Sequence, residues 1–315
     1  MTTSRPTNVT VFGAAGFVGR YVVQALARSG ARIRAVTRDP QNAAFLKPLG
    51  GLGQLAIVRG DLQNDSSVEA VCAEADAVVN LVGVFAGQGQ DVDAIHVDGA
   101  KRAAEAARDA GARAFVQMSA LGADPKAQSD YARSKGEGET AVREAMPVST
   151  IFRPSTVFGP EDEFLNRFAN LIRLSPLMPV VGGETKFQPV YVADLAEAVA
   201  SAALDPVEHG GKTYEIGGPD VISMRELLVW IARTIGKDES FIDVPNGLTE
   251  RLTKSFGWLP GAPLTYDQFL MLQKDNVLAG ENGLSAFGIS PTPMQAVAPN
   301  WLVRYRKQGR FTKVA

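Results

Sequence analysis

The chain of 315 residues has little of several residue types, and each shortage removes a class of protein. A single cysteine, Cys72, excludes an internal disulfide framework and fits a reducing compartment. Two histidines, His96 and His209, lack nearby cysteines or carboxylates at metal-ligand spacing, so we expect no metal site. The net charge of −2 provides no general attraction to nucleic acid, and we expect none to bind.

Long apolar runs are also missing. No stretch of about 18 apolar residues occurs, so nothing predicts a membrane span. The polar residues 1–7 lack the apolar centre of a secretory signal and any obvious targeting presequence, which leads us to expect a bacterial protein. A hydrophobic content of 45% with 21% charged residues is typical of a globular protein, so a membrane contact would be peripheral.

The most informative segment is a glycine-rich turn, Val9-Thr-Val-Phe-Gly13-Ala-Ala-Gly16-Phe-Val-Gly19-Arg20. An apolar run precedes the glycines and a helical pattern follows, which is the context of a dinucleotide-binding fingerprint rather than of an ordinary turn. Gly13 permits the sharp turn, Gly16 lets a pyrophosphate approach, and Gly19 lets the helix pack on the strand. We expect the nucleotide to contact Gly13, Ala15, Gly16, Phe17, Val18, Gly19 and Arg20, near the positive end of the helix.

Strand-like and helical runs then alternate. The predicted strands are 9–12, 32–36, 55–58, 77–82, 114–118 and 148–152, with helices at 41–49, 66–73, 92–110 and 130–145. This alternation predicts an α/β fold of the Rossmann type, with a doubly wound parallel sheet and the ligand at the carboxyl ends of its strands. The predicted nucleotide domain is 1–155, completed by about 190–205. A smaller, discontinuous lobe is predicted at 156–189 and 206–315.

Charged residues near the first two strands indicate which nucleotide binds. NAD-preferring folds have an acidic residue close to the end of the second strand, where it binds the ribose 2′-hydroxyl. Here Arg38 comes first, and Arg20 follows the last glycine. Two guanidinium groups suit a 2′-phosphate, so NADP(H) is favoured over NAD(H). The alternative is that Arg38 pairs with Asp39 in solvent.

Later strand ends supply further candidate contacts. Asp61 is placed to bind the adenine amino group, and Leu62 to pack on the ring. Asn80, Val82 and Gly83 follow the fourth strand and are expected beneath the nicotinamide-side ribose.

A candidate catalytic set follows the fifth strand. Ser119 ends that strand, and Tyr131 and Lys135 lie four residues apart on the next helix, which places them on one face. A lysine ammonium beside a phenol favours the phenolate, so we expect a lowered Tyr131 pKa. Ser119 could then orient a substrate oxygen while Tyr131 acts as acid or base in hydride transfer. The alternative is an ordinary surface pair.

These residues resemble the short-chain dehydrogenase/reductase superfamily, in its extended and atypical epimerase-like branch. The motifs Arg153-Pro-Ser-Thr-Val-Phe-Gly159 and Val190-Tyr-Val-Ala-Asp194 are similar to that branch, and the resemblance adds Pro154 to the nucleotide contacts. Within the branch, the sequence resembles the NAD(P)H-binding accessory subunits of respiratory complex I and their bacterial relatives. The segments that carry this similarity are Asn80-Leu-Val-Gly, His96-Val-Asp-Gly99, Ser129-Asp-Tyr-Ala-Arg-Ser-Lys-Gly-Glu-Gly-Glu139 and Phe287-Gly-Ile-Ser-Pro-Thr292.

The resemblance implies a protein that holds a reduced nicotinamide nucleotide and stabilises an assembly rather than turning over. It implies complex I subunits as partners and a peripheral location on the cytoplasmic side of the bacterial inner membrane, or in the cytoplasm. Phe12 replaces the threonine usual in true epimerases, and the link from Ser119 to Tyr131 is short. An intact Ser119, Tyr131 and Lys135 set keeps a soluble NADP-dependent reductase or epimerase as the alternative. A redox sensor acting through a partner is a third interpretation.

The C-terminal end mixes basic and aromatic residues. Residues 300–313 contain five basic residues and no acidic one, interleaved with Trp301, Tyr305 and Phe311. Such a segment suits contact with anionic headgroups or a partner, with help from apolar residues in 264–278. The alternative is a solvated basic tail whose aromatic residues pack in the core.

Overall fold

The computed structural model describes residues 7–85, 91–175, 177–238, 240–259, 262–307 and 309. Its central element is a sheet of seven parallel strands in the order β11-β6-β5-β4-β1-β2-β3. These strands are β1 (Asn8–Phe12), β2 (Arg32–Thr37), β3 (Leu55–Arg59), β4 (Ala77–Asn80), β5 (Ala114–Met118), β6 (Thr150–Pro154) and β11 (Thr213–Ile216). The predicted Rossmann-type fold is confirmed, and the strand order reverses at β1 and β4, where such sheets bind ligands.

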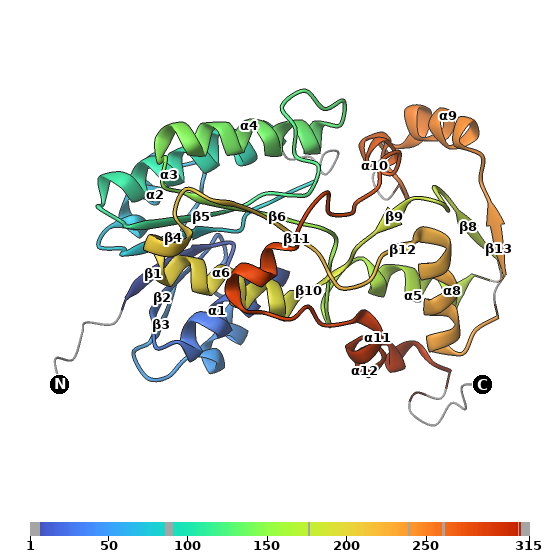
Figure 1. Cartoon of the computed structure of the whole chain (residues 1–315), viewed down its shortest axis with the longest axis horizontal. Coiled ribbons are helices and arrows are strands. Elements are labelled where there is room, and N and C mark those ends of the chain that lie inside the picture. Colours follow the sequence, from blue (N-terminus) through green and yellow to red (C-terminus); the bar gives the residue numbers. More distant parts are fainter. Residues whose placement is uncertain are drawn as a thin grey trace.

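Helices cover both faces of this sheet (Figure 1). On one face α1 (Phe17–Arg28) packs against α6 (Val192–Leu204). On the other face lie α2 (Asp65–Cys72), α3 (Ala100–Asp109) and α4 (Asp130–Ala145). Every residue of β4 and β5 is buried, as expected for strands covered on both sides. Two separate apolar cores result, one on each face.

Two predicted helices differ in kind from the prediction. The helix expected at 41–49 is the 3₁₀ helix η1 (Ala44–Leu49), which contains Pro48, a residue without the N–H that an α-helix needs. The helix expected at 92–110 begins as a π-helical segment, η2 (Ala94–Gly99), before α3. Such wide turns are rare and frequently mark functional sites.

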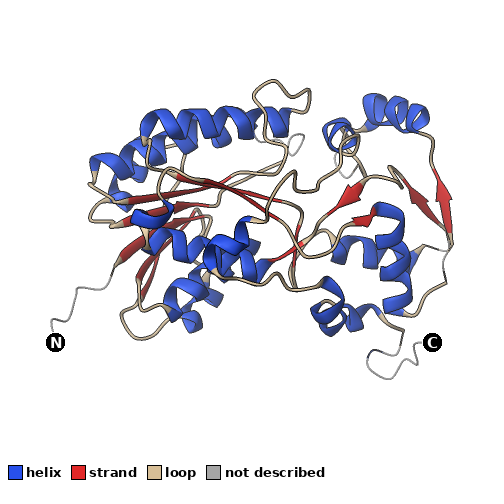
Figure 2. Ribbon diagram, viewed as in Figure 1, coloured by secondary structure: helices blue, strands red, loops and turns tan. Residues whose placement is uncertain are grey.

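Figure 2 shows a smaller lobe beside the large sheet. This lobe has its own apolar core. It contains the short strands β7 (Val157–Phe158), β8 (Met178–Val180), β9 (Lys186–Phe187), β10 (Val190–Tyr191), β12 (Ile222–Ser223) and β13 (Phe241–Asp243). Its helices are α5 (Leu165–Leu174), α8 (Met224–Ile235), α9 (Asn246–Phe256), α10 (Tyr266–Met271), α11 (Met294–Val297), α12 (Pro299–Leu302) and the 3₁₀ helix η4 (Val303–Tyr305). Among these, α8 begins with a capping box of Ser223 and Glu226 and ends at Gly236 in the left-handed conformation.

The sequence pattern places all of 206–315 in the smaller lobe, and the structure differs at two points. After α7 (Pro206–His209), strand β11 joins the large sheet beside β6. The 3₁₀ helix η3 (Gly283–Phe287) then buries Leu284 in the core beneath that sheet. Both segments are short, and only their long-range pairing assigns them to the nucleotide domain.

Within the described residues, no helix has the length and apolarity needed to cross a membrane. The same part of the chain contains no cluster of three or more histidine, cysteine, aspartate or glutamate residues that could hold a metal ion.

Candidate functional site

The turns after β1, β4 and β5 meet at one edge of the sheet. Phe12 lies opposite Asn80, and Asn80 lies opposite Gln117, so the three strands end at the same level. Gly13 has a φ of +75°, which only glycine adopts readily. A Cβ at Gly13 would also lie 3.3 Å from the Val82 side chain, so the first and fourth turns touch there.

The start of α1 suits a pyrophosphate. No described side chain caps this helix end, and its first turn holds no acidic residue, which leaves N–H groups and the positive dipole end to an anion. The amide of Gly16 donates to the carbonyl oxygen of Gly13 at 3.0 Å, which closes the turn. Ala15, Phe17 and Val18 are half-buried around it. These residues fit the diphosphate of a nicotinamide dinucleotide.

Two arginines were predicted to bind a 2′-phosphate. The Arg20 guanidinium lies 4.6 Å from the Phe45 ring centroid and 3.6 Å from Glu161, and its Nε is buried without a partner. Arg38 is exposed and makes no hydrogen bond or ion pair with a described residue. Asp39 instead accepts bonds from the amides that follow it, so the alternative pair with Arg38 does not form. Binding of the phosphate by these arginines stays a prediction.

The residues at the end of β3 bond mainly to the turn and the helix, α2, that follow this strand. The Asp61 carboxylate accepts from the Gln63 amide at 3.0 Å, and the Asp61 amide donates to Ser67 Oγ at 3.1 Å. Leu62 is 5% exposed and belongs to the core around α2 and α3. Little of its side chain is therefore left to cover an adenine ring.

Asn80 fixes the turn after β4. This buried amide donates to Gln117 Oε1 at 2.9 Å and accepts from the Val82 amide at 3.2 Å. The next residue, Gly83, approaches α4, where a Cβ would lie 3.2 Å from Lys135 Nζ. Of the predicted Asn80, Val82 and Gly83, the last thus lies beside the candidate catalytic helix.

Tyr131 and Lys135 occupy the first turns of α4, but the lowered pKa expected for Tyr131 is wrong. Burial, with a contribution from the Asp267 carboxylate, raises the pKa of Tyr131 to about 12. Lys135 Nζ lies 5.8 Å from the ring centroid and donates to the Met118 carbonyl oxygen at 3.2 Å. Burial also lowers the pKa of Lys135 to about 8. A lysine held by a backbone oxygen stabilises the phenolate less than the sequence suggested.

Ser119 is buried and its hydroxyl is already engaged. It donates to Glu139 Oε1 at 2.5 Å, and both oxygens of Glu139 accept from Arg153 at 2.9 and 2.6 Å. The Ser119 oxygen can accept a further bond, but its proton is not free to polarise a substrate carbonyl. Sequence reasoning missed this role of Glu139, although its spacing from Tyr131 and Lys135 places all three on one helix face.

Pro154 ends β6 next to this ion pair. It is buried, and its carbonyl oxygen accepts from the Leu121 amide at 2.9 Å, just beyond Ser119. The turn that carries Ser119 is therefore fixed against β6, since the Ser119 amide also donates to the Phe152 carbonyl oxygen at 2.7 Å.

His96 was not predicted as a site residue, yet it supports Tyr131. Its Nε2 accepts from the Val84 amide at 3.0 Å, so the ring proton is on Nδ1, which donates to Ser134 Oγ at 2.9 Å. Ser134 in turn donates to the Tyr131 carbonyl oxygen at 3.1 Å. The Tyr131 ring lies between the edge of His96 and the stacked ring of Phe85, with centroids 5.6 and 4.9 Å away. The segment His96-Val-Asp-Gly99, which carries part of the family resemblance, was the sequence signal that contained this residue.

Acidification is expected to destabilise the protein through His96. Burial lowers the pKa of His96 to about 3 from a usual value of 6.5. Because the unfolded chain binds the proton more readily between these values, the stability is fully present above about pH 6.5 and is lost as the pH falls toward 3. This group should remove about 2 kcal/mol of unfolding free energy between about pH 6.5 and 4.5. Denaturant titration of wild type and His96→Gln at several pH values isolates the contribution of His96, since the carboxylates titrate in both proteins. If the unfolding free energies of the two proteins fall in parallel with pH, His96 is not the cause of the loss.

The C-terminal aromatic residues pack inward. The Trp301 ring stacks near Phe158 and Tyr191, with centroids 6.4 and 6.5 Å away, and Tyr305 contacts the same core. The alternative of core packing therefore holds for both. Arg310, Phe311 and Lys313 lie outside the described residues.

The chain is similar to several known proteins. The NAD dependent epimerase/dehydratase family matches residues 9–217. NADH dehydrogenase (ubiquinone) 1 alpha subcomplex subunit 9, mitochondrial, of Arabidopsis thaliana is 33% identical over 314 residues, covering 95% of this chain and 78% of that protein. The ceramide reductase of Caulobacter vibrioides is 34% identical over 200 residues, covering 63% of this chain and 62% of that protein.

A solved structure shows the same fold. The NADPH-dependent quinone oxidoreductase of Escherichia coli, in complex with NADPH, superimposes with a TM-score of 0.74 at 19% identity, covering 92% of this chain and 98% of that one. From the family match and the relatives together, the chain belongs to the NAD dependent epimerase/dehydratase family, the extended branch of the short-chain dehydrogenases/reductases, and is homologous to a subunit of respiratory complex I.

Proposed function

We propose that this chain is an accessory or assembly subunit of a respiratory complex I, in which a bound NADP(H) is mainly structural. The observation that carries the proposal is the similarity along 95% of the chain to a protein named as a subunit of NADH dehydrogenase. Similarity over such a length includes the smaller lobe, which the epimerase pattern at 9–217 largely omits. Partners of this chain are therefore other subunits of that complex.

The candidate catalytic set supports holding rather than turnover. A general acid or base works best when its pKa lies near the working pH. The pKa of Tyr131 is instead raised to about 12, and the Ser119 proton is donated to Glu139. The free helix end and the glycine turn, in contrast, are arranged for a dinucleotide.

NADP(H) is the nucleotide we favour, with NAD(H) as the alternative. Arg38 has no partner within the described chain, and the buried Nε of Arg20 has no hydrogen-bond partner. Both guanidinium groups can therefore pair with the two extra negative charges of a 2′-phosphate. The fold neighbour from Escherichia coli was solved with NADPH.

Docking to the complex is assigned to α9 rather than to the C-terminal aromatics. Leu248, Leu252 and Phe256 recur every four residues along α9 and are exposed, and Trp258 and Leu259 continue this apolar ridge. Exposed apolar patches of this kind mark contact sites. We place the protein on the cytoplasmic side of the bacterial inner membrane, held peripherally by this ridge and by the basic residues around Arg304.

A soluble NADP-dependent reductase is the second candidate. The similarity to a ceramide reductase supports it, but that similarity covers only 63% of the chain. The two functions differ in their dependence on Tyr131, because a reductase needs its phenol and a structural subunit does not.

Native electrophoresis of gently solubilised membranes tests the proposal. We expect the chain to co-migrate with the large complex that an in-gel NADH dehydrogenase stain reveals. Tyr131→Phe should leave this assembly unchanged, whereas Arg38→Glu should weaken it by repelling the 2′-phosphate.

The controls separate nucleotide binding from docking. Replacing both Leu252 and Phe256 with glutamate should release the chain from the complex while leaving NADPH binding unchanged, since α9 lies outside the glycine turn. If wild type runs only as a small species, or if Tyr131→Phe alone removes its function in cells, the subunit proposal fails and the reductase replaces it.

A further inference from the structure

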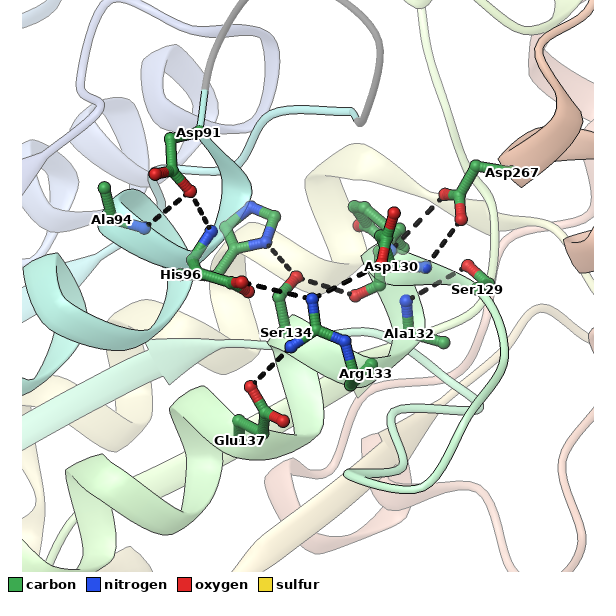
Figure 3. A network of polar contacts seen from close by, with 12 residues as sticks. Asp91, Ala94, His96, Ser129, Asp130, Ala132, Arg133, Ser134, Glu137 and Asp267 are labelled. Atoms are coloured by element: carbon green, nitrogen blue, oxygen red, sulfur yellow. Dashed lines mark hydrogen bonds and ion pairs between the residues drawn. The ribbon is translucent and has the colours of Figure 1, made fainter.

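The two lobes meet at the first turn of α4. Ser129 caps this helix locally by accepting from the Ala132 amide at 3.3 Å. The amides of Asp130 and Tyr131 donate instead to the two carboxylate oxygens of Asp267, at 2.6 and 3.3 Å (Figure 3). Asp267 belongs to α10 in the smaller lobe, so part of the cap of α4 comes from the other lobe.

The carboxylate closest in sequence cannot replace Asp267. The side chain of Asp130 pairs with Arg133 at 3.3 Å. Arg133 also binds Asp93 at 3.1 Å and Glu137 at 2.8 Å (Figure 3). This network engages the Asp130 side chain, which is 63% exposed. At the start of α4, Asp267 is therefore the acceptor for the backbone amides of Asp130 and Tyr131.

The segment that carries Asp267 is itself anchored. Thr265 and Gln268 form a capping box at the start of α10, and Phe269 is buried. Further along, the Asn276 side-chain oxygen accepts from Ser155 Oγ at 2.7 Å, directly after β6. The smaller lobe is thus tied to the site edge at two points, one of them beside Tyr131.

We propose that Asp267 is a positioning residue of the nucleotide site, which holds the smaller lobe closed against the helix that carries Tyr131 and Lys135. This inference rests on the proposed nucleotide-holding function. A carboxylate at a helix N-terminus is stabilised by charge-assisted bonds and by the helix dipole. Its bonds to Asp130 and Tyr131 must break before the lobes separate and the nucleotide leaves.

The rate of NADPH dissociation from the full-length protein tests the proposal. Asp267→Ala should release NADPH about tenfold faster than wild type, the factor expected for removal of a helix cap. Asp267→Asn keeps one acceptor oxygen, so its rate of NADPH release should lie between those of wild type and Asp267→Ala. The matched control is Asp275→Ala, which removes a carboxylate that accepts from the Lys186 amide at 2.9 Å within the smaller lobe, and it should release NADPH at the wild-type rate.

A second readout reports on Tyr131 directly. The Asp267 charge contributes to the raised pKa of Tyr131, so Asp267→Ala should lower that pKa and Asp275→Ala should not. A pH titration of the phenolate absorbance, taken as the difference between each protein and its Tyr131→Phe version, measures the pKa of Tyr131 without nucleotide.

The outcomes are distinct. Unchanged NADPH release in Asp267→Ala, or equal acceleration in Asp275→Ala, overturns the positioning role. If wild type binds no NADPH, the proposed function fails, and an unchanged Tyr131 pKa would then overturn the Asp267 contact independently.

Discussion

Replacing Gly19 with alanine is expected to abolish nucleotide binding and to destabilise the nucleotide domain by about 3 kcal/mol. A Cβ at this position would lie 2.1 Å from the Gly13 carbonyl oxygen and 2.7 Å from that of Ala14. Both atoms belong to the backbone of the turn, so neither can move aside without opening it. Opening the turn displaces the amides that face the phosphates. Thermal unfolding and NADPH titration measure the two effects.

The matched control is Gly247→Ala, near the start of α9. A Cβ there meets no atom within 4 Å, and the residue is not in the left-handed conformation. Its unfolding free energy should change by no more than about 0.5 kcal/mol, with NADPH affinity unaltered. Wild-type affinity in Gly19→Ala would show that the turn is not the phosphate site.

The second large effect is expected from Arg153→Met. Glu139 is 8% exposed and accepts two hydrogen bonds from Arg153. Among the described residues, the substitution therefore leaves this buried carboxylate with the Ser119 hydroxyl as its hydrogen-bond donor. Removing one partner of a buried ion pair costs about 3 kcal/mol or more. Chemical denaturation should show this loss.

The double variant Glu139→Gln with Arg153→Met separates charge from packing. It removes the unpaired carboxylate and keeps an acceptor for Ser119, so most of the lost stability should return. If the double variant is as unstable as Arg153→Met alone, the loss comes from packing of the arginine rather than from an unpaired charge.

Local patterns predicted the features that depend on few residues. The glycine turn at Gly13, Gly16 and Gly19 and the alternation of strands and helices are both short-range, because backbone conformation and apolar periodicity follow from neighbouring residues. The family resemblance extended this to the complex I subunits and is confirmed by similarity along the chain. The assignments of Arg20 and Arg38 to the nucleotide stay predictions.

Other features were missed because distant segments create them. His96 and Phe85 enclose Tyr131 only after the turn beyond β4 folds against α4. For the C-terminal Trp301 the sequence left surface contact and core packing both open, and the structure packs it against the core of the smaller lobe. Burial of this kind depends on which elements become neighbours, and no local pattern records that.

The sequence by itself determined the fold class, the phosphate-binding turn and the family, since each depends on residues close together in the chain. Only the tertiary structure decided the chemistry of Tyr131, Ser119 and Lys135. Their protonation and hydrogen bonds depend on desolvation and on partners from other elements. Ser119 at the end of β5 donates to Glu139 of α4, Lys135 of α4 donates to Met118 of β5, and the Tyr131 amide donates to Asp267 of α10. Electrostatic effects act through space, so a motif can name the reacting groups while the fold sets their pKa values.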